Sequence, residues 1–551
     1  MTTHVTPPAS PALEASACAP NVGADASRTS SRVRAAWIGF FCVLALGISV
    51  FWLFDALPFQ DLPAHAGLIA MRHRFDTMGS PFEERFYVLA PHIGPYSLFR
   101  LLGEAFIRMK MSPVSAVRML GTLPVIATPL ALMHARRRLF DDRSPTFGFL
   151  GVALSFGLMT LLGFASYLLG VAFMLFGLTM WLELLVASDD RAPSARRLEL
   201  VMAIFAPAMF FAHGHAFLLF LLCAVVSSVA AGRRLARLVR LRALVPALGV
   251  AAYVAWLERG TTTPPGSAPM VNNLVPHFHD ALHKLGLLVT PTLMTHTLVD
   301  AVSGGLMWIF AIAAAVVTMR TIRRAAPDAP KDIRHSRALY ACAAAIGVVF
   351  LVLPEHIGWF GFVDGRLAPI ILLLGLIGVR RDVLPRAMRL ALDKGAPVIA
   401  ATIASVALVA SYRFQDEAQG YREVLSRVPA ESALLNLPLD PNSDVFTAHP
   451  FVHYDKLVLA ERPTVVSDVW FHQGTAIYPK PPNPALRLPS SYSESNLKTI
   501  DWPAYHLEDW DYVLIRTRPT AAQPHTPDRL VLEDHRGGWW LFRRTGVRSE
   551  R

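Results

Sequence analysis

Long apolar blocks separated by short basic connections dominate the chain up to about residue 412. A helix needs about 20 apolar residues to cross the hydrocarbon core of a bilayer, and many blocks reach or approach that length. The pattern predicts a polytopic α-helical membrane bundle of about 11 spans, with a range of about 10 to 13. The predicted spans cover about residues 37–57, 113–133, 145–163, 167–187, 200–231 (two spans), 243–257, 298–318, 338–353, 367–379 and 397–412.

The rest of the chain divides into three polar parts around this bundle of residues 34–412. Residues 1–33 are rich in Ala, Ser, Pro and Thr, which predicts a disordered tail. Residues 58–112 form a long loop after the first span, with a charged helix at about 95–109 that we expect at the membrane surface. Residues 413–551 predict a small α/β soluble domain. Its expected elements are a helix at 421–429, buried strands at 432–439, 456–460 and 511–516, and a hairpin around 536–538.

Charge orients the predicted bundle. The net charge is +11, and basic runs near Arg136, Arg196, Arg237, Arg323 and Arg381 alternate with connections poor in Lys and Arg. This positive-inside pattern predicts a cytoplasmic N-terminus and a non-cytoplasmic C-terminal domain in a bacterial plasma membrane. Basic residues confined to connections between spans argue against nucleic acid as a partner. The four cysteines show neither a disulfide framework nor a metal-binding spacing.

Asp61 and His65 follow the first predicted span, in the segment PFQDLPAHAG. A carboxylate at the membrane face can accept a proton from a hydroxyl group or bind a cation. Asp61 can equally cap a helix that begins at Leu62 and Pro63, because Asp is a favoured N-cap residue and Pro is favoured just inside a helix. The two interpretations are compatible.

Histidines and an arginine stand in other predicted turns on the same side. His213 and His215 divide the block 200–231 and could bind a metal or a phosphate, or serve as polar residues of a turn. In PEHIGWFGFVDGRLAP, Arg366 opens a span on the face where the positive-inside rule disfavours it. A bound phosphate would explain it, as would a pair with Asp364 or an arginine whose head reaches the interface. His356 lies in the same turn, and His279 and His283 allow either a zinc pair or a surface helix.

These features together resemble the GT-C superfamily of membrane glycosyltransferases. The resemblance lies in Asp61 of QDLPAH after the first span, the long external loop, Arg366 of GFVDGRLAP before a late span, and an external α/β domain with DYVLIR and GGWWLFRR. It implies inverting transfer of a sugar from a polyprenyl-phosphate donor to a glycan, lipid or protein acceptor on the non-cytoplasmic face.

The resemblance also implies roles for particular residues. Asp61 and His65 would be catalytic, with Asp61 as the base. The donor would be bound by Arg366, His213, His215, His356 and Asp364. The resemblance assigns no definite cofactor, although a divalent cation could take part. The sequence departs from many members in having no second carboxylate beside Asp61; Glu83 and Glu84 come later in the loop.

A second hypothesis is a membrane protein without enzymatic activity, either a transporter or a scaffold whose external domain binds a partner. A transporter is expected to show inverted repeats and broken helices near the midplane, and His213 could mark such a break. A transferase instead requires Asp61 and Arg366 to lie together. The relative position of these two residues therefore separates the hypotheses.

Overall fold

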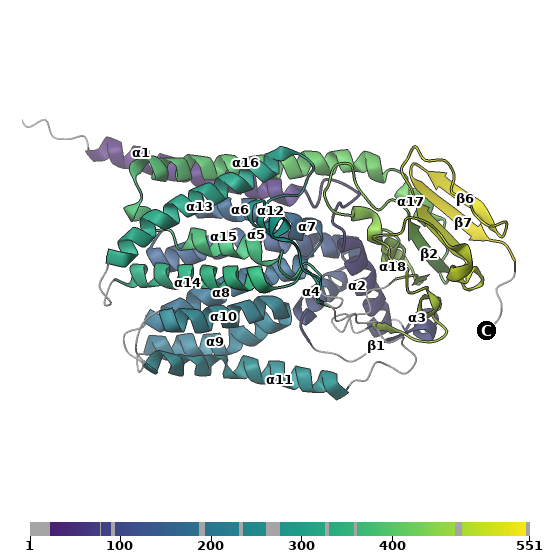
Figure 1. Cartoon of the computed structure of the whole chain (residues 1–551), viewed down its shortest axis with the longest axis horizontal. Coiled ribbons are helices and arrows are strands. Elements are labelled where there is room, and N and C mark those ends of the chain that lie inside the picture. Colours follow the sequence, from purple (N-terminus) through teal and green to yellow (C-terminus); the bar gives the residue numbers. More distant parts are fainter. Residues whose placement is uncertain are drawn as a thin grey trace, which may run out of the picture.

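A helical bundle and a mixed sheet domain lie end to end in the computed structural model (Figure 1). The structure describes residues 22–77, 79–89, 94–186, 193–230, 235–260, 276–324, 330–357, 361–468 and 477–546. The long helices run side by side along the long axis of the molecule, and the sheet domain covers one end of them.

Each predicted span overlaps a helix of the bundle, and the span predicted at 145–163 is divided into two short helices. The helices of the bundle are α1 (Val22–Ser49), α5 (Pro113–Phe140), α6 (Thr146–Leu154), α7 (Leu158–Leu161), α8 (Ala165–Val186), α9 (Pro193–Ala212), α10 (Gly214–Ala230), α11 (Val245–Gly260), α13 (Leu298–Arg324), α14 (Lys331–Val352), α15 (Leu367–Ile377) and α16 (Arg386–Ala418), with 3-10 helices η1 (Leu235–Leu244) and η2 (Arg381–Val383). Within the described residues, six segments are long and apolar enough to cross a membrane. The total of about 11 spans stays a prediction.

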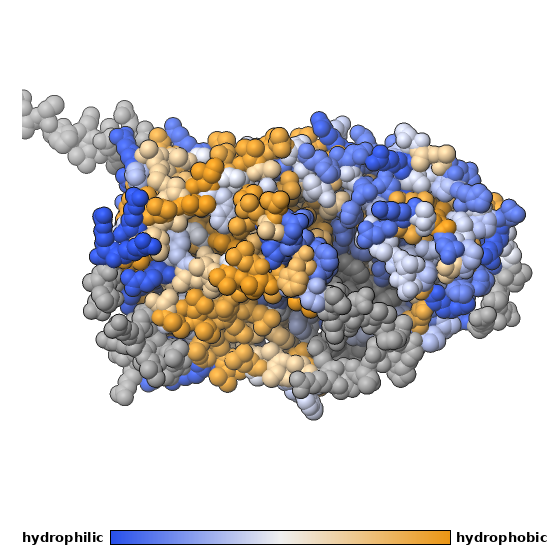
Figure 2. Space-filling view, in the orientation of Figure 1, coloured by the Kyte–Doolittle hydropathy of each residue, from blue (hydrophilic) through white to orange (hydrophobic). Residues whose placement is uncertain are grey.

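The bundle presents an apolar surface that a soluble protein would not expose. Figure 2 shows hydrophobic residues over the middle of the bundle and hydrophilic residues at its far end and on the sheet domain. Along α13, one helical face carries exposed large side chains from Val302 through Ile309 to Val316. Such a continuous apolar stripe is suited to lipid contact. The chain is a membrane protein.

Two helix boundaries differ from the expectation. The first helix begins at Val22, inside the segment predicted as a disordered tail, whose residues 1–21 lie outside the described part. It ends at Ser49 because the apolar residues that follow pack in a turn, where the rings of Phe51 and Phe59 stack 4.5 Å apart. At the other end of the bundle, α16 extends into the predicted domain, and Gln415 bonds both backbone groups of Ala56.

The loop after α1 is folded and lies between the bundle and the domain. Its elements are α2 (Leu62–Thr77), α3 (Pro81–Phe86), β1 (Tyr87–Leu89) and α4 (Ser97–Arg108), and a further short helix outside the bundle is α12 (Ala281–Val289). The predicted charged helix corresponds to α4. Ser97, Phe99, Gly103 and Glu104 form its buried side.

The C-terminal domain is built on a five-stranded sheet of order β3-β2-β5-β7-β6. The strands β3, β2 and β5 are parallel, whereas β7 runs antiparallel to both β5 and β6. The predicted hairpin is formed by β6 and β7. The domain contains β2 (Ala433–Pro438), β3 (Val465–Val466), β4 (Ile477–Pro479), β5 (Tyr512–Arg516), β6 (Leu530–Arg536), β7 (Trp539–Arg544), α17 (Tyr421–Ser426), α18 (Lys456–Glu461), η3 (Pro450–His453), η4 (Pro484–Arg487), η5 (Trp502–Tyr505) and η6 (Leu507–Asp509).

One predicted strand of this domain is wrong. Residues 456–460 belong to helix α18, although the sequence KLVLA was interpreted as a strand. A short apolar run buried on most sides has no periodicity that distinguishes a strand from a helix. The helix packs closely on α2, since a Cβ atom at Gly67 would lie 2.8 Å from the carbonyl oxygen of Lys456.

The loop and the domain are joined by backbone pairing as well. Strand β1 pairs antiparallel with β4, with Tyr87 opposite Pro479. Nearby, the Tyr454 hydroxyl donates a hydrogen bond of 2.9 Å to the carbonyl oxygen of Leu57. The domain is therefore bound to the segment that precedes Asp61.

Candidate functional site

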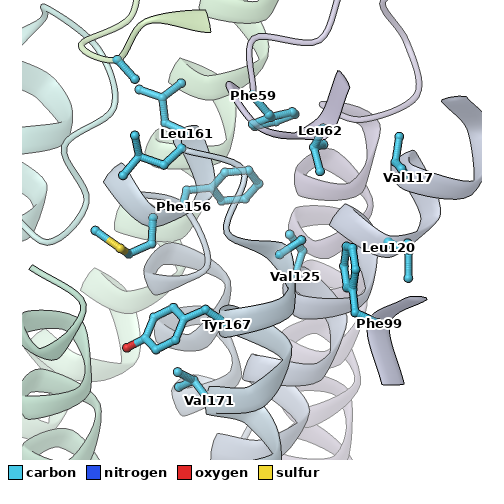
Figure 3. Close-up of a cluster of buried hydrophobic side chains, with 14 of the residues drawn as sticks. Phe59, Leu62, Phe99, Val117, Leu120, Val125, Phe156, Leu161, Tyr167 and Val171 are labelled. Atoms are coloured by element: carbon cyan, nitrogen blue, oxygen red, sulfur yellow. The ribbon is translucent and has the colours of Figure 1, made fainter. Parts of the chain in front are cut away.

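The backbone of Asp61 is held against a turn of the bundle. Asp61 lies in the connection between α1 and α2, and its N–H donates to the carbonyl oxygen of Leu162 at 3.2 Å. Gly163 adopts a φ of +78°, and a Cβ atom there would lie 2.8 Å from the Asp61 nitrogen. This close approach requires glycine. Phe59 and Leu62, which lie on either side of Asp61 in the sequence, pack beside Phe156 in a buried apolar cluster (Figure 3).

The carboxylate of Asp61 is buried without a hydrogen bond. Asp61 is 1% exposed, and among the described residues neither of its carboxylate oxygens has a hydrogen-bond partner. The capping interpretation of this side chain is therefore wrong: only the backbone oxygen of Asp61 takes part in α2, accepting from the His65 N–H at 3.0 Å. Burial raises the pKa of the Asp61 carboxyl well above its usual range, and the positive charge of Arg366 opposes that shift.

Arg366 lies close enough to act on Asp61 electrostatically, at the start of α15. It is 6% exposed, and its guanidinium donates to the carbonyl oxygen of Gly361 at 3.0 Å. The guanidinium also lies over the rings of Phe164 and Tyr167, at 4.5 and 5.5 Å from the ring centroids. Such cation–π contacts hold a guanidinium in place without neutralising its charge. The structure thus brings Asp61 and Arg366 to one site.

The two histidines of the α9–α10 turn join the same site. His213 separates these helices, and its ring lies 4.6 Å from that of Tyr96 and 5.2 Å from that of Tyr167. The ring of His215 stacks on Tyr167 at 5.8 Å. Tyr96 in turn bonds the guanidinium of Arg366. The histidines therefore stand at a turn between two helices, as one interpretation held, and the structure places them near Arg366.

Asp364 and His356 belong to a neighbouring polar cluster. Asp364 accepts a hydrogen bond from His279 Nδ1 at 3.0 Å and lies 3.6 Å from Lys284 Nζ. His356 is closer to the surface, with its Nδ1 3.4 Å from a carboxylate oxygen of Glu355. The carboxylate of Asp364 therefore has partners of its own, His279 and Lys284, in this neighbouring cluster. No group of three or more potential metal ligands occurs within the part of the chain that the structure describes.

Glu83, which could have replaced the missing second carboxylate, has a structural partner. Its side chain is fully buried, and Arg74 Nε donates to it at 3.0 Å. The same arginine donates to the carbonyl oxygen of Leu459 in α18 at 2.8 Å. Glu83 therefore supports the contact between loop and domain.

Comparison with solved structures finds chains of similar fold. The first is ArnT from Cupriavidus metallidurans bound to undecaprenyl phosphate, at a TM-score of 0.53 and 12% identity, covering 92% of this chain and 97% of that chain. The chain therefore shares the overall fold of ArnT. Weaker likenesses are to mycobacterial arabinofuranosyltransferase AftD (0.49, 14% identity, 92% of this chain and 40% of that chain) and an Archaeoglobus fulgidus oligosaccharyltransferase (0.42, 12%, 87% and 68%).

At the level of sequence, the chain has no match that would refine this assignment. No protein-family model matches it, and no curated protein matches it. The likeness to ArnT is therefore one of fold alone, and the chemistry has to be argued from the site itself.

Within this fold, the C-terminal domain contributes a residue that the sequence did not reveal. His453 Nε2 lies 3.7 Å from Asp61 Oδ1, and its Nδ1 bonds Glu494 at 3.0 Å. His65 lies beside His453, and its ring lies 5.0 Å from that of Phe99; burial and then the charge of His453 lower the pKa of His65 to about 4. The only sequence signal was the polar run His453-Tyr454-Asp455-Lys456 within an otherwise apolar segment.

Proposed function

We propose that this protein is an inverting glycosyltransferase that moves a sugar from a polyprenyl-phosphate donor to a hydroxyl group of an envelope acceptor. The transfer would take place on the non-cytoplasmic face of a bacterial plasma membrane. The observation that carries the proposal is the buried carboxylate of Asp61, which accepts no hydrogen bond within the described residues, beside the guanidinium of Arg366. An ionised carboxylate without hydrogen bonds costs several kcal/mol to bury, on the order of the penalty for other isolated charges. A carboxylate that is retained at such a cost in folding stability is a candidate catalytic group.

The two residues have complementary roles in the proposed reaction. Asp61 accepts the proton of the acceptor hydroxyl as that oxygen bonds to the anomeric carbon of the sugar. The bond from this carbon to the phosphate oxygen breaks, and the phosphate leaves with the electron pair. Arg366 binds the donor phosphate and stabilises its growing negative charge. Attack from the face opposite the phosphate inverts the anomeric configuration.

Aromatic and histidine side chains complete the donor side of the site. Tyr96, Tyr167, His213 and His215 surround Arg366 and offer hydrogen-bonding groups to the phosphate or to sugar hydroxyls. Among these side chains, the guanidinium of Arg366 is the strongest anion-binding group. The apolar outer surface of the adjacent helices suits a donor that carries a long hydrocarbon chain.

Asp61→Asn tests the role of Asp61 directly. In a strain that lacks the protein, we expect one lipid-linked sugar to accumulate and one envelope glycan to lose a sugar. The wild-type chain should restore the glycan, and Asp61→Asn should reduce its formation by at least about 100-fold, the usual effect of losing a general base. Mass spectrometry of lipid-linked sugars and envelope glycans measures both.

A matched control is Asp55→Asn in the same connection. Asp55 is exposed and pairs with Arg422 at 3.1 Å, so its loss removes a surface ion pair. We expect this variant to restore the glycan fully. Full restoration by Asp61→Asn, at equal protein level in the membrane, would remove Asp61 from the mechanism and with it the proposed function.

A further inference from the structure

A buried polar cluster of the C-terminal domain lies directly behind Asp61. Asn436 of β2, His453 of η3, Lys456 of α18 and Glu494 are each at most 4% exposed. Glu494 joins them: it accepts from Lys456 Nζ at 2.6 Å, from Asn436 Nδ2 at 3.0 Å and from His453 Nδ1 at 3.0 Å. So many donors on one carboxylate keep it ionised and fixed.

The cluster determines which way the imidazole of His453 faces. Because an ionised carboxylate only accepts hydrogen bonds, Nδ1 of His453 is the donor to Glu494. Its other nitrogen, Nε2, then lies 3.7 Å from Asp61 Oδ1. The adjacent Tyr454 anchors this segment to Leu57, four residues before Asp61. The domain therefore presents His453 to the connection that carries the proposed base.

We propose that His453 is a positioning residue for Asp61: as an imidazolium held by Glu494, it faces the Asp61 carboxylate and keeps it ionised and ready to accept a proton. This inference rests on the proposed function for its catalytic consequence, but the charge interaction itself can be measured without a substrate. It assigns the C-terminal domain a part in the site, through a side chain that lies far from Asp61 in the sequence.

The surrounding charges agree with this arrangement. Burial alone would raise the pKa of Glu494, but Lys456 and His453 outweigh it and lower that pKa to about 2, so Glu494 is an anion at neutral pH. Three further groups bear on the pair. Arg366 acts on Asp61 from α15, the charge of His453 lowers the pKa of His65 in α2 after burial, and the buried carboxyl of Asp468 also interacts with His453.

The decisive experiment is an infrared pH titration of Asp61 in the full-length protein reconstituted in lipid nanodiscs. The band of the protonated Asp61 carboxyl is identified by its loss in Asp61→Asn. In His453→Gln, the midpoint of this band should move to higher pH by about one unit, since a cation next to the carboxylate has been removed. The control His525→Gln removes an exposed histidine of the same domain and should titrate like the wild type.

Transfer kinetics give the second readout. His453→Gln should lower kcat by about tenfold at neutral pH, leave the KM for the donor unchanged and recover at higher pH, as expected for a residue that supports the base. A merely structural defect would not recover with pH. If His453→Gln fails to fold, Glu494→Gln serves in its place, with a smaller shift in the same direction.

Two different failures can be told apart. If the Asp61 band of a folded His453→Gln or Glu494→Gln protein titrates together with the wild type, the inference about His453 is overturned while the proposed function stands. If Asp61→Asn retains full transfer, the proposed function is overturned, and the role of His453 in transfer falls with it even where the infrared shift is observed.

Discussion

Two buried aspartates at the start of helices have opposite surroundings. Asp300 stands in the first turn of α13 and Asp61 immediately before α2, and each is 1% exposed. Asp300 accepts hydrogen bonds from the N–H groups of Met294, Thr295 and Ala301 and from the Thr295 hydroxyl, at 2.7 to 3.0 Å. Asp61 accepts none through its carboxylate within the described part of the chain.

The difference separates an aspartate used for folding from one available for chemistry. Hydrogen bonds to a charged group each contribute about 1.5 to 3 kcal/mol, so Asp300 stabilises the turn before α13. The Asp61 side chain makes no hydrogen bond in the described part of the chain and has only the nearby charges of Arg366 and His453, so its burial costs stability. Sequence position alone does not distinguish them, since Asp is favoured at the start of a helix in both cases.

The largest expected effect is on folding, at Asp300. Asp300→Asn replaces one acceptor oxygen by an amide that faces N–H donors, and we expect a loss of about 3 kcal/mol in the free energy of unfolding. Thermal unfolding in detergent measures it. The transfer activity of the remaining folded protein should stay at the wild-type level. An unchanged melting temperature would remove the distinction between the two aspartates.

The next effect concerns the neighbour of Asp61. Arg366→Gln removes the guanidinium while keeping a polar side chain, and we expect affinity for the polyprenyl phosphate to fall about 30-fold, or about 2 kcal/mol for a charged hydrogen-bond pair. Binding in nanodiscs, followed by native mass spectrometry, measures this. The control is Arg137→Gln, in the last turn of α5. This variant should bind the polyprenyl phosphate as the wild type does.

A smaller effect of opposite sign is expected at Asp61. Asp61→Asn replaces a buried charge by a neutral amide of similar shape, so it should raise the melting temperature at neutral pH by about 2 °C, corresponding to about 1 kcal/mol. Asp61→Asn would then lower activity and raise stability, whereas Asp300→Asn lowers stability at unchanged activity. A lower melting temperature for Asp61→Asn would show that the attraction of Arg366 and His453 outweighs the cost of burying the charge of Asp61.

The smallest effect is the pH dependence of the higher melting temperature expected for Asp61→Asn. The folded-state pKa of Asp61 lies above its unfolded value near 3.8, so the cost of the buried charge is complete above the folded pKa. As pH falls through the folded pKa, Asp61 becomes protonated and the cost decreases. The difference in melting temperature between Asp61→Asn and the wild type should therefore shrink on acidification. A constant difference would mean that the Asp61 pKa is not raised.

The sequence predicted the helices better than their ends. Apolar blocks of sufficient length predict helices whatever their packing, and the break at His213 was visible because it is polar. The end of α1 was not predictable, because residues after Ser49 are also apolar and leave the helix only to pack Phe51 against Phe59. The helix α18 was missed for a similar reason, as its burial is set by α2 and not by its own pattern.

The candidate site divides in the same way. Asp61 and Arg366 stood out in the sequence because each breaks a local rule for membrane proteins, one as a lone carboxylate and the other as an arginine on the disfavoured face. His453 and Glu494 break no local rule and follow no motif. Their relation to Asp61 depends on how the domain docks, which neither periodicity nor charge patterning encodes.

The pairing of β1 with β4 has a consequence for biogenesis. Strand β1 belongs to the first loop to leave the ribosome, whereas its partner β4 is synthesised only after every helix of the bundle. Until then the edge of β1 and the face of α2 that receives α18 have no partner. The segment that carries Asp61 therefore lacks these contacts during most of translation. A ribosome that stops within α16 would release a bundle whose site is not covered by α18 and β4.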